Sequence, residues 1–342
     1  MGSGRRAATP RRARWRRLAL AASLALAAAA GLAGTLGALA GFAWWLELFA
    51  HFRPQYAIVL AASGLALLAL GARTPAIATL LLCALNALPL LHYYRPQPAP
   101  PPAGVELRAA LANVWFRNDD PQPLLAWLRE NRPDVAVLLE VPSAWRDAIG
   151  TLAGELPHQA RAGDVVVASR LPLRDLRLLP FGDGEGAVAF SVVLGGETVT
   201  VIGAHADWPL GPASAARRNA QLEALAGLAS GSPAPVLLLG DLNVSAFSPH
   251  FARLLAAGGL ADCAAGRGFS PSWPVGFPPL ALRIDHCLHG PGLAVARLAN
   301  GPRIGSDHRP LAVTVSRAPR NGDANYFSSR KPPERSGGGQ GK

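Results

Sequence analysis

The spacing of apolar residues divides the chain into two parts. Between positions 18 and 92 the chain is almost free of charge, whereas beyond position 105 the apolar runs are short and separated by turn residues. The first part holds three long apolar stretches, at residues 18 to about 43, 56–72 and 76 to about 91. Each falls within the length range of a helix that spans a bilayer, and none shows an amphipathic face. We therefore expect three transmembrane helices within residues 18–94, rather than three buried helices of a soluble bundle.

Charges beside these stretches predict how the chain is oriented. Residues 1–17 contain seven Arg and no acidic residue, which favours a cytoplasmic leader. A cleaved signal peptide or a nucleic-acid-binding arm is the alternative, but further apolar stretches follow at once. Trp44 and Trp45 are typical of a membrane interface, and Glu47, His51 and Arg53 are assigned to a short polar loop. Three crossings place the rest of the chain outside the cytoplasm, as a multi-pass protein of the inner or plasma membrane.

A Pro-rich spacer at residues 95–104 marks the boundary to a second domain, predicted at 105–316 and followed by a disordered tail at 317–342. The predicted strands of this domain are residues 107–114, 135–139, 164–169, 187–194, 198–204, 236–239, 282–288 and 311–315. The predicted helices are residues 121–131, 143–152, 213–229 and 247–257. Two of the strands meet at Gly195-Gly196, a hairpin signal. Hairpins mixed with helical crossovers predict mixed sheets covered by helices.

Composition adds two restrictions. The net charge of +11 is concentrated at the ends of the chain, because residues 105–316 carry 17 Arg, no Lys and 19 acidic residues. The second domain therefore lacks the positive charge expected of a nucleic-acid-binding domain. The three cysteines are Cys83, Cys263 and Cys287. The last two could pair, but a single candidate pair is not a disulfide framework, and we read them as buried thiols.

Polar residues recur at the ends of the predicted strands. Asp241 and Asn243 follow the apolar run 236–239, and residues two apart on an extended chain point the same way. A carboxylate that orients water beside an amide that donates to phosphoryl oxygens suits phosphate-ester hydrolysis. For this segment alone, a strand followed by an Asx-type turn is the favoured explanation. Six further residues share this strand-end placement, each with a structural explanation when taken singly: Asn113, Glu140, His205, Asp285, Asp307 and His308. Their coincidence indicates one site.

Together these residues resemble the motifs of the endonuclease/exonuclease/phosphatase superfamily, in the family's order. The matching motifs are Asn113, Glu140, His205, Gly240-Asp241-Leu242-Asn243, Ile284-Asp285 and Ser306-Asp307-His308. The segment Ala168-Ser169-Arg170-Leu171-Pro172 also resembles a family segment, which implies a substrate-binding role for Arg170. The three apolar stretches resemble those of a membrane-anchored bacterial subset. The resemblance implies a four-layer α/β sandwich, two mixed sheets flanked by helices, preceded here by three transmembrane helices.

The resemblance also implies a chemistry, hydrolysis of a phosphate ester with Mg²⁺ or Mn²⁺. Carried over by position, Glu140 is the principal metal ligand, with Asn113 beside it and Asp307 close by. His308 paired with Asp285 orients or activates the attacking water, while Asp241 and Asn243 position it. His205 contacts the phosphate or assists the leaving group. Family nucleases often pair this histidine with an acid, which the sequence does not identify; Asp207 is only a neighbour.

These expectations define a membrane-anchored phosphoesterase. Its substrate could be a nucleic acid, a phospholipid or a small phosphodiester, because a fold does not fix a substrate. The domain is compact and near neutral in charge, which argues against tight binding of duplex DNA. The alternative is a catalytically silent binding domain on a membrane anchor, disfavoured because every motif position keeps its reactive residue type. The lipid bilayer is the expected partner of residues 18–94, and no protein partner is predicted.

Overall fold

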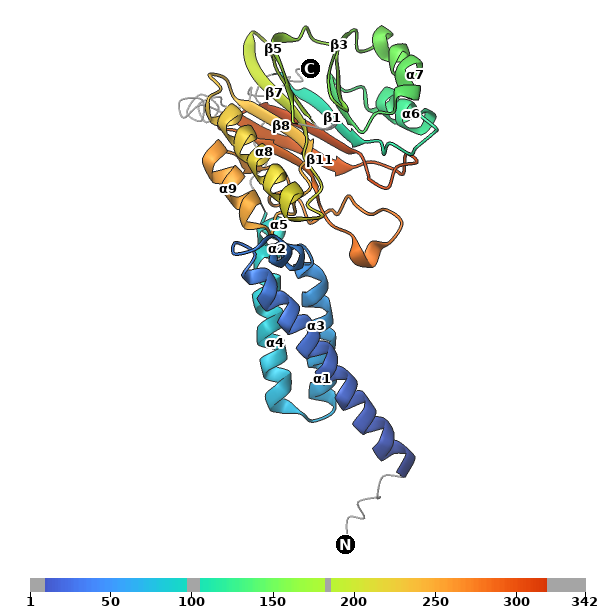
Figure 1. The fold of residues 1–342 in the computed structure, drawn as a ribbon, viewed down its shortest axis with the longest axis vertical. Helices are drawn as coiled ribbons and strands as arrows, with labels where there is room; N and C mark the ends of the chain where they lie inside the picture. The colour runs from blue at the N-terminus through green and yellow to red at the C-terminus, as the bar shows by residue number, and fades with distance from the viewer. Residues whose placement is uncertain (1–9, 97–104, 182–185, 319–342) are drawn as a thin grey trace, which may run out of the picture.

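The computed structural model describes residues 10–96, 105–181 and 186–318. A helical bundle occupies one end of the molecule and two β-sheets occupy the other (Figure 1). The N-terminal part of the leader, most of the Pro-rich spacer and nearly all of the predicted tail lie outside the described residues. The helical elements of the bundle are α1 (Pro10–Ala38), α2 (Trp44–Ala50), α3 (Arg53–Ala69), α4 (Arg73–Ala87), the 3-10 turn η1 (Leu88–Leu90) and α5 (Leu91–Tyr94).

Two six-stranded mixed sheets follow. In the first sheet the strand order is β11-β12-β1-β2-β4-β3, and in the second it is β5-β6-β7-β8-β10-β9. The strands of the first sheet are β1 (Leu107–Asn113), β2 (Val135–Leu139), β3 (His158–Ala162), β4 (Val165–Ser169), β11 (Leu293–Asn300) and β12 (Leu311–Arg317). Those of the second are β5 (Arg174–Pro180), β6 (Gly186–Leu194), β7 (Glu197–His205), β8 (Val236–Asp241), β9 (Ala261–Asp262) and β10 (Asp285–His289).

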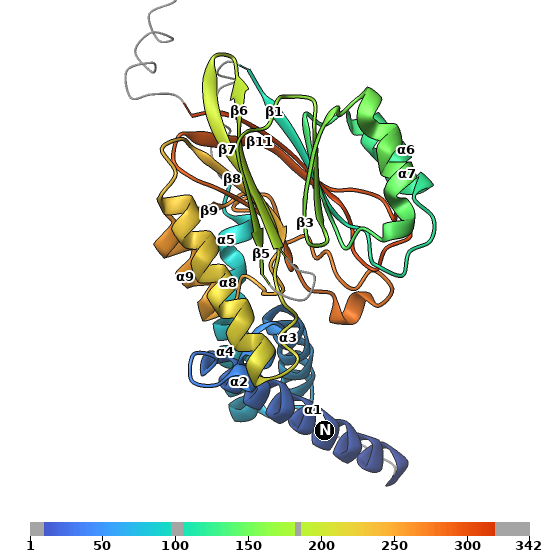
Figure 2. The same cartoon turned by 45° about the horizontal axis from the view of Figure 1, so that its top comes forward.

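Helices cover the outer face of each sheet, which gives four layers. One outer layer holds α6 (Gln122–Asn131) and α7 (Arg146–Gly150), between the 3-10 turns η2 (Ser143–Trp145) and η3 (Thr151–Gly154). The other holds α8 (Pro212–Ser230) and α9 (Pro249–Gly258). Figure 2 shows the two helical layers on opposite sides of the paired sheets. A core of Val, Leu and Phe side chains fills the space between the sheets, and a further core lies under each helical layer. The predicted sandwich is confirmed.

Within the central strands the predicted segments agree with the structure to within a few residues. The β6–β7 hairpin turns at Gly195 and Gly196, whose φ angles of 58° and 85° suit a two-residue hairpin turn. Other bounds differ. The helix predicted at 247–257 begins at Pro249 because the side chain of Ser248 caps it by accepting the N–H of His250. The segment predicted as a helix at 143–152 is a short α-helix between two 3-10 turns.

The described bundle contains two helices that are long and apolar enough to cross a membrane, Arg11–Ala38 and Arg73–Tyr94. The pair Trp44–Ala50 and Arg53–Ala69, bent by 55°, makes a third if it counts as one span. The expected polar loop between the first two stretches is wrong. Glu47 lies in α2 and is buried against Arg218 of α8, and His51 is buried against Ser245. The bundle therefore docks on the sandwich through side chains that the sequence assigned to solvent.

The interpretation of Cys263 and Cys287 as separate thiols is also wrong, because the structure joins them in a disulfide. The two residues lie at the edge of the second sheet, where the N–H of Cys263 donates to the carbonyl of Cys287 at 3.0 Å. The strand that brings Cys263 there, β9, has only two residues, and no hydrophobic pattern marks it. Cys83, in α4, remains a free thiol.

Candidate active site

The polar residues predicted to converge do so at one end of the paired sheets. Strands β1 and β2 run parallel, so Asn113 pairs with Leu139 and Glu140 follows directly beyond it. Strands β7 and β8 also run parallel, with His205 opposite Asp241. Antiparallel β10 begins at this edge, with its first residue opposite Asp241. Both sheets thus deliver polar side chains to the same edge, and these side chains are buried.

His308 is held between carboxylates from neighbouring strands. Its Nδ1 lies 2.8 Å from Oδ2 of Asp285, and its Nε2 lies 3.7 Å from Oδ2 of Asp241. Asp307 Oδ1 is 3.9 Å from the same Nε2. The loop before β12 is fixed to the first sheet because the Ser306 hydroxyl donates to the carbonyl of Asn113 at 2.8 Å. The structure thus forms the contact between Asp285 and His308 expected from the sequence.

Asn113 connects the carboxylates of the two sheets. Its amide nitrogen donates to Oε1 of Glu140 at 2.8 Å and to Oδ2 of Asp241 at 3.0 Å. The other oxygen of Glu140 accepts the N–H of Phe116 at 3.2 Å. The amide oxygen of Asn113 accepts the N–H of Trp115 and keeps one further lone pair. This bridge fixes the distance between Glu140 and Asp241.

His205 has an acidic partner that the sequence did not identify. Its Nδ1 lies 2.6 Å from Oδ2 of Asp164, the residue just before β4. Its Nε2 faces Oε1 of Glu140 at 3.7 Å and has no hydrogen bond. The neighbour Asp207 instead pairs with Arg217. The only sequence signal for Asp164 was its position at the start of a buried Val run, which does not show that the strand faces His205.

The turn after β8 is tightly constrained. A Cβ atom added at Gly240 would lie 2.3 Å from the carbonyl oxygen of Ala204 on β7, so only glycine allows β7 and β8 this close approach. Glu140 has φ of 54°, a left-handed value that is uncommon for Glu, whereas Asn243, with φ of 47°, belongs to a residue type that adopts this conformation more readily. Such backbone strain is frequent at functional sites.

Asn243 itself is bound to the backbone. Its amide nitrogen donates to the carbonyl of Ala206 at 2.8 Å, and its N–H donates to Oδ1 of Asp241 at 3.0 Å. Its carbonyl accepts from Nη1 of Arg218 at 2.7 Å. In this arrangement Asn243 holds together the ends of β7 and β8. Its amide nitrogen carries a second N–H, so the bond to Ala206 does not prevent a contact with a phosphoryl oxygen.

Negative charge dominates the site. Burial alone lowers the pKa of His308, but the adjacent Asp285 and Asp241 carboxylates raise it to about 10. Burial likewise lowers the pKa of His205, which Asp164 raises to about 9. Burial and the Asp285 charge raise the pKa of Asp241 to about 6. Burial also raises the pKa of Asp285, but the charge of His308 and its hydrogen bond outweigh this effect and leave it lowered.

This donor set fits a divalent metal ion. Two groups of side chains each bring their ligand atoms within 4.8 Å of one another: Glu140, His205 and Asp241, and Asp241, Asp285 and His308. Oδ1 of Asp285 and Oδ1 of Asp307 are buried without a hydrogen-bond partner. Hard carboxylate oxygens in small number suit Mg²⁺. A cation among them would also offset the negative charge that raises the pKa of both histidines.

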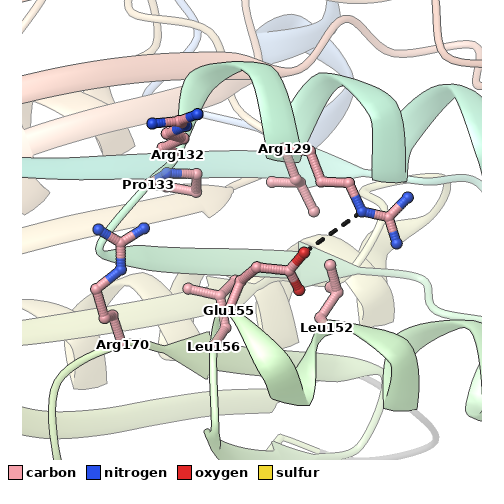
Figure 3. A pocket seen from close by; sticks show the side chains of 8 residues that line it. Arg129, Arg132, Pro133, Leu152, Glu155, Leu156 and Arg170 are labelled. Atoms are coloured by element: carbon pink, nitrogen blue, oxygen red, sulfur yellow. Dashed lines mark ion pairs between the residues drawn. The ribbon is translucent and has the colours of Figure 1, made fainter.

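Arg170 is the one predicted site residue that the structure does not bring to this cluster. It follows β4 at the opposite end of the first sheet from Glu140, where its N–H donates to the carbonyl of Asp134 at 2.8 Å. There it lines a surface hollow together with Arg129, Arg132 and Glu155 (Figure 3). The implied substrate contact of Arg170 is therefore wrong for this site. Because β2 and β4 are antiparallel, the last residue of β4 lies beside the first residue of β2, far from Glu140.

Two residues outside the predicted set support the cluster. Trp273 donates its indole N–H to Oδ2 of Asp307 at 2.9 Å. The hydroxyl of Ser272 accepts the N–H of Asp285 at 3.3 Å. Both come from the loop before β10, whose apolar and proline-rich sequence gave no sign of a polar role.

Comparisons with known proteins agree with this architecture. Residues 110–308 match the sequence model of the Endonuclease/Exonuclease/phosphatase family. No curated protein sequence matches the chain. The solved endonuclease/exonuclease/phosphatase from Beutenbergia cavernae superposes with a TM-score of 0.54 at 19% identity, covering 63% of this chain and 72% of that one. Humanized TDP2 from D. rerio gives a TM-score of 0.53 at 16% identity, covering 62% of this chain and 99% of that one.

The catalytic domain of human Nocturnin gives a TM-score of 0.51 at 14% identity, covering 63% of this chain and 96% of that one. At these identities the superpositions show the fold alone. The family itself rests on the match that begins within β1 and ends at His308, and so includes every strand-end residue of the cluster. The chain belongs to the endonuclease/exonuclease/phosphatase family.

Proposed function

We propose that this protein is a divalent-metal-dependent phosphoric-ester hydrolase anchored in a membrane by its N-terminal helices. The observation that carries the proposal is the joining of the Asp285–His308 pair, Asp241, Asn113 and Glu140 into one buried cluster across two sheets. A silent binding domain has no need for a hydrogen-bonded acid–imidazole pair beside unpartnered carboxylate oxygens. A D. rerio TDP2 structure holds a single-strand DNA product, which supports a phosphate ester as the substrate class.

The roles follow from the hydrogen bonds. Asp285 occupies Nδ1 of His308, which leaves Nε2 free for the attacking water, and Asp241 lies beside that nitrogen. The water oxygen bonds to phosphorus as the ester P–O bond breaks, and one water proton passes to Nε2 of His308. This step requires Nε2 to be unprotonated, and a cation bound among the carboxylates would lower the pKa of His308 toward that state. Nε2 of His205, buried and without a hydrogen bond, donates a proton to the departing oxygen. Glu140, Asn113 and Asp307 would hold the metal ion, which would polarise the phosphoryl oxygens and offset the charge that develops on them.

The test uses the full-length protein with Mg²⁺ and the soluble diester bis(4-nitrophenyl) phosphate. Glu140→Gln keeps the shape of the side chain but removes its charge, and His308→Ala removes the imidazole. Each should lower turnover by about 10²–10⁴-fold while circular dichroism stays unchanged. Arg170→Ala, outside the cluster, is the control. Near-normal turnover in both site variants, or activity independent of Mg²⁺, would refute the proposed mechanism.

The membrane placement has separate support. Large apolar side chains of the bundle are exposed along α1, α3 and α4, among them Leu26, Ile58 and Leu81. Exposed apolar surface of that extent is unfavourable in water. With an Arg-rich leader, we infer a cytoplasmic N-terminus and a catalytic domain on the other side. A reporter that is active only outside the cytoplasm, fused after Arg317, should be active; activity of a cytoplasmic reporter at that junction would reverse the orientation.

A further inference from the structure

The loops around the active site expose large apolar side chains. Phe116 lies three residues after Asn113, and Trp208 and Leu210 follow His205. Phe277 and Leu280 lie in the loop before β10. Leu210 is 78% exposed and Phe277 is 55% exposed. An isolated exposed apolar residue is ordinary, but here three loops around a single site carry them.

Two of these loops are bonded directly to the site. The N–H of Phe116 donates to the Glu140 carboxylate at 3.2 Å. In the loop before β10, the indole N–H of Trp273 donates to Oδ2 of Asp307 at 2.9 Å, and the N–H of Val275 donates to the carbonyl of Asp307 at 2.8 Å. Their apolar tips therefore form the rim of the site. We call Phe116, Trp208, Leu210, Phe277 and Leu280 the apolar rim.

The helical bundle docks at the same edge of the sandwich. Glu47 pairs with Arg218 in the first half of α8, just after the loop that carries Trp208. His51 contacts Ser245, two residues beyond Asn243, at 2.9 Å. Both ribbon views show the start of α8 and the loop with the 3-10 turn η4 (Pro278–Leu280) beside the upper end of the bundle (Figures 1 and 2). The active site and the anchor therefore share one side of the catalytic domain.

One hydrogen bond relates the rim to the membrane boundary. The Gln55 side chain donates to the carbonyl of Ala281 at 3.0 Å. Gln55 immediately precedes the apolar run 56–72, and Ile58, less than one helical turn further on, is 70% exposed. Ala281 therefore lies level with the start of the apolar surface of the bundle, and the adjoining Leu280 and nearby Phe277 extend that surface toward the site.

On the basis of the proposed function, we propose that the apolar rim rests on the bilayer that holds the helices, and that the substrate is a phosphate ester in the headgroup of a membrane lipid. Transfer of apolar side chains from water into a bilayer beside a membrane-spanning bundle is favourable in free energy. A headgroup at that surface reaches the site without leaving the membrane. A nucleic acid would have to approach a domain with a net charge of −2 across an apolar rim. The reaction adds water to the headgroup P–O bond and releases one alcohol and one phosphate product.

The surface is tested by the depth of a label. In full-length protein with Cys83→Ala, an environment-sensitive fluorophore is attached at Leu280→Cys and, as a matched control, at Val105→Cys. Val105 is also exposed and precedes β1, at the end of that strand opposite Asn113. In vesicles containing brominated phosphatidylcholine, the label at 280 should be quenched and the label at 105 should not. Equal quenching at both positions, or none at 280, would overturn the membrane contact.

The substrate is tested in vesicles of phosphatidylethanolamine, phosphatidylglycerol and phosphatidic acid with Mg²⁺. Lipid phosphate esters should be cleaved faster than a short single-stranded DNA by about tenfold or more, because both enzyme and substrate are confined to the surface. Faster cleavage of DNA than of lipid, with bis(4-nitrophenyl) phosphate still hydrolysed, would refute the lipid substrate and leave the hydrolase intact. If the soluble diester also resists and Glu140→Gln changes nothing, the proposed function fails as well.

Discussion

The ion pair of Glu47 and Arg218 should be required for the stability of the whole molecule. Glu47 is 1% exposed and Arg218 is 0% exposed, so both charges are withdrawn from water. Glu47 also accepts from the Ser248 hydroxyl, and Arg218 donates to the Asn243 carbonyl at 2.7 Å. Removing one charge of such a pair leaves the other buried and uncompensated, at a cost of about 3–5 kcal/mol. Glu47→Gln makes this change with almost no change in volume.

At about 2–4 °C per kcal/mol for a domain of this size, that loss corresponds to a fall of about 6–20 °C in the apparent thermal midpoint. The assay is the midpoint of the full-length protein in detergent, with all variants heated at one scan rate. Glu223→Gln, the same change at an exposed position of α8, should alter stability by less than about 0.5 kcal/mol. Turnover of Glu47→Gln should also fall, because Arg218 would no longer hold the backbone at Asn243.

The double variant Glu47→Gln/Arg218→Met separates an uncompensated charge from a simple loss of packing. Replacing both members of a buried pair is often close to neutral, so the double variant should regain much of the midpoint lost by Glu47→Gln. A midpoint for Glu47→Gln equal to that of wild type would refute the reasoning. A double variant no more stable than Glu47→Gln would show that packing, and not the stranded Arg218 charge, causes the loss.

Two further predictions concern the site. Gly240→Ala places a methyl group against the Ala204 carbonyl, so it should destabilise the protein by about 1–3 kcal/mol. Gly227→Ala in α8 should not, because a Cβ added there meets no atom of another element within 4 Å. Equal thermal midpoints for the two variants would refute the close approach of β7 and β8. Asp164→Asn removes the charge beside His205, so kcat should fall about 10–100-fold with little change in KM. Asp147→Asn, the same change at an exposed position of α7, should leave kcat unchanged. An unchanged kcat in Asp164→Asn would exclude a role for Asp164 in positioning His205.

The central strands of both sheets could be predicted because they are buried on both faces and form continuous apolar runs. The four missed strands, β3, β5, β9 and β11, are the four edges of the two sheets. Edge strands pack against fewer neighbours, and their sequences alternate less regularly, as His158–Ala162 illustrates with three partly or fully exposed polar positions. The local hydrophobic pattern therefore identified the central strands of each sheet and missed the edge strands.

The site residues could be predicted for a related reason. Polar residues at the ends of apolar runs such as 236–239 are visible in sequence, and parallel neighbours bring them to one edge. Contacts between side chains of the two facing sheets have no such signal in the sequence. Asp164 meets His205 only because β4 and β7 face each other across the sandwich. Cys263 meets Cys287 only through a two-residue strand. Arg170 matched a motif, but antiparallel pairing sends the end of β4 away from the site.

Several polar residues within the almost uncharged part of the chain, residues 18–92, make contacts that their local sequence does not predict. A charged or strongly polar side chain withdrawn from water is costly unless it is paired. Here Glu47 pairs with Arg218, His51 with Ser245, and Gln55 with Ala281. All three partners lie in the second part of the chain, at the edge that holds the active site. Polar interruptions in an otherwise apolar segment thus indicate where the helical bundle and the sandwich meet. A fragment beginning at Val105 would retain Arg218 without Glu47, so the catalytic domain should be studied with its helices attached.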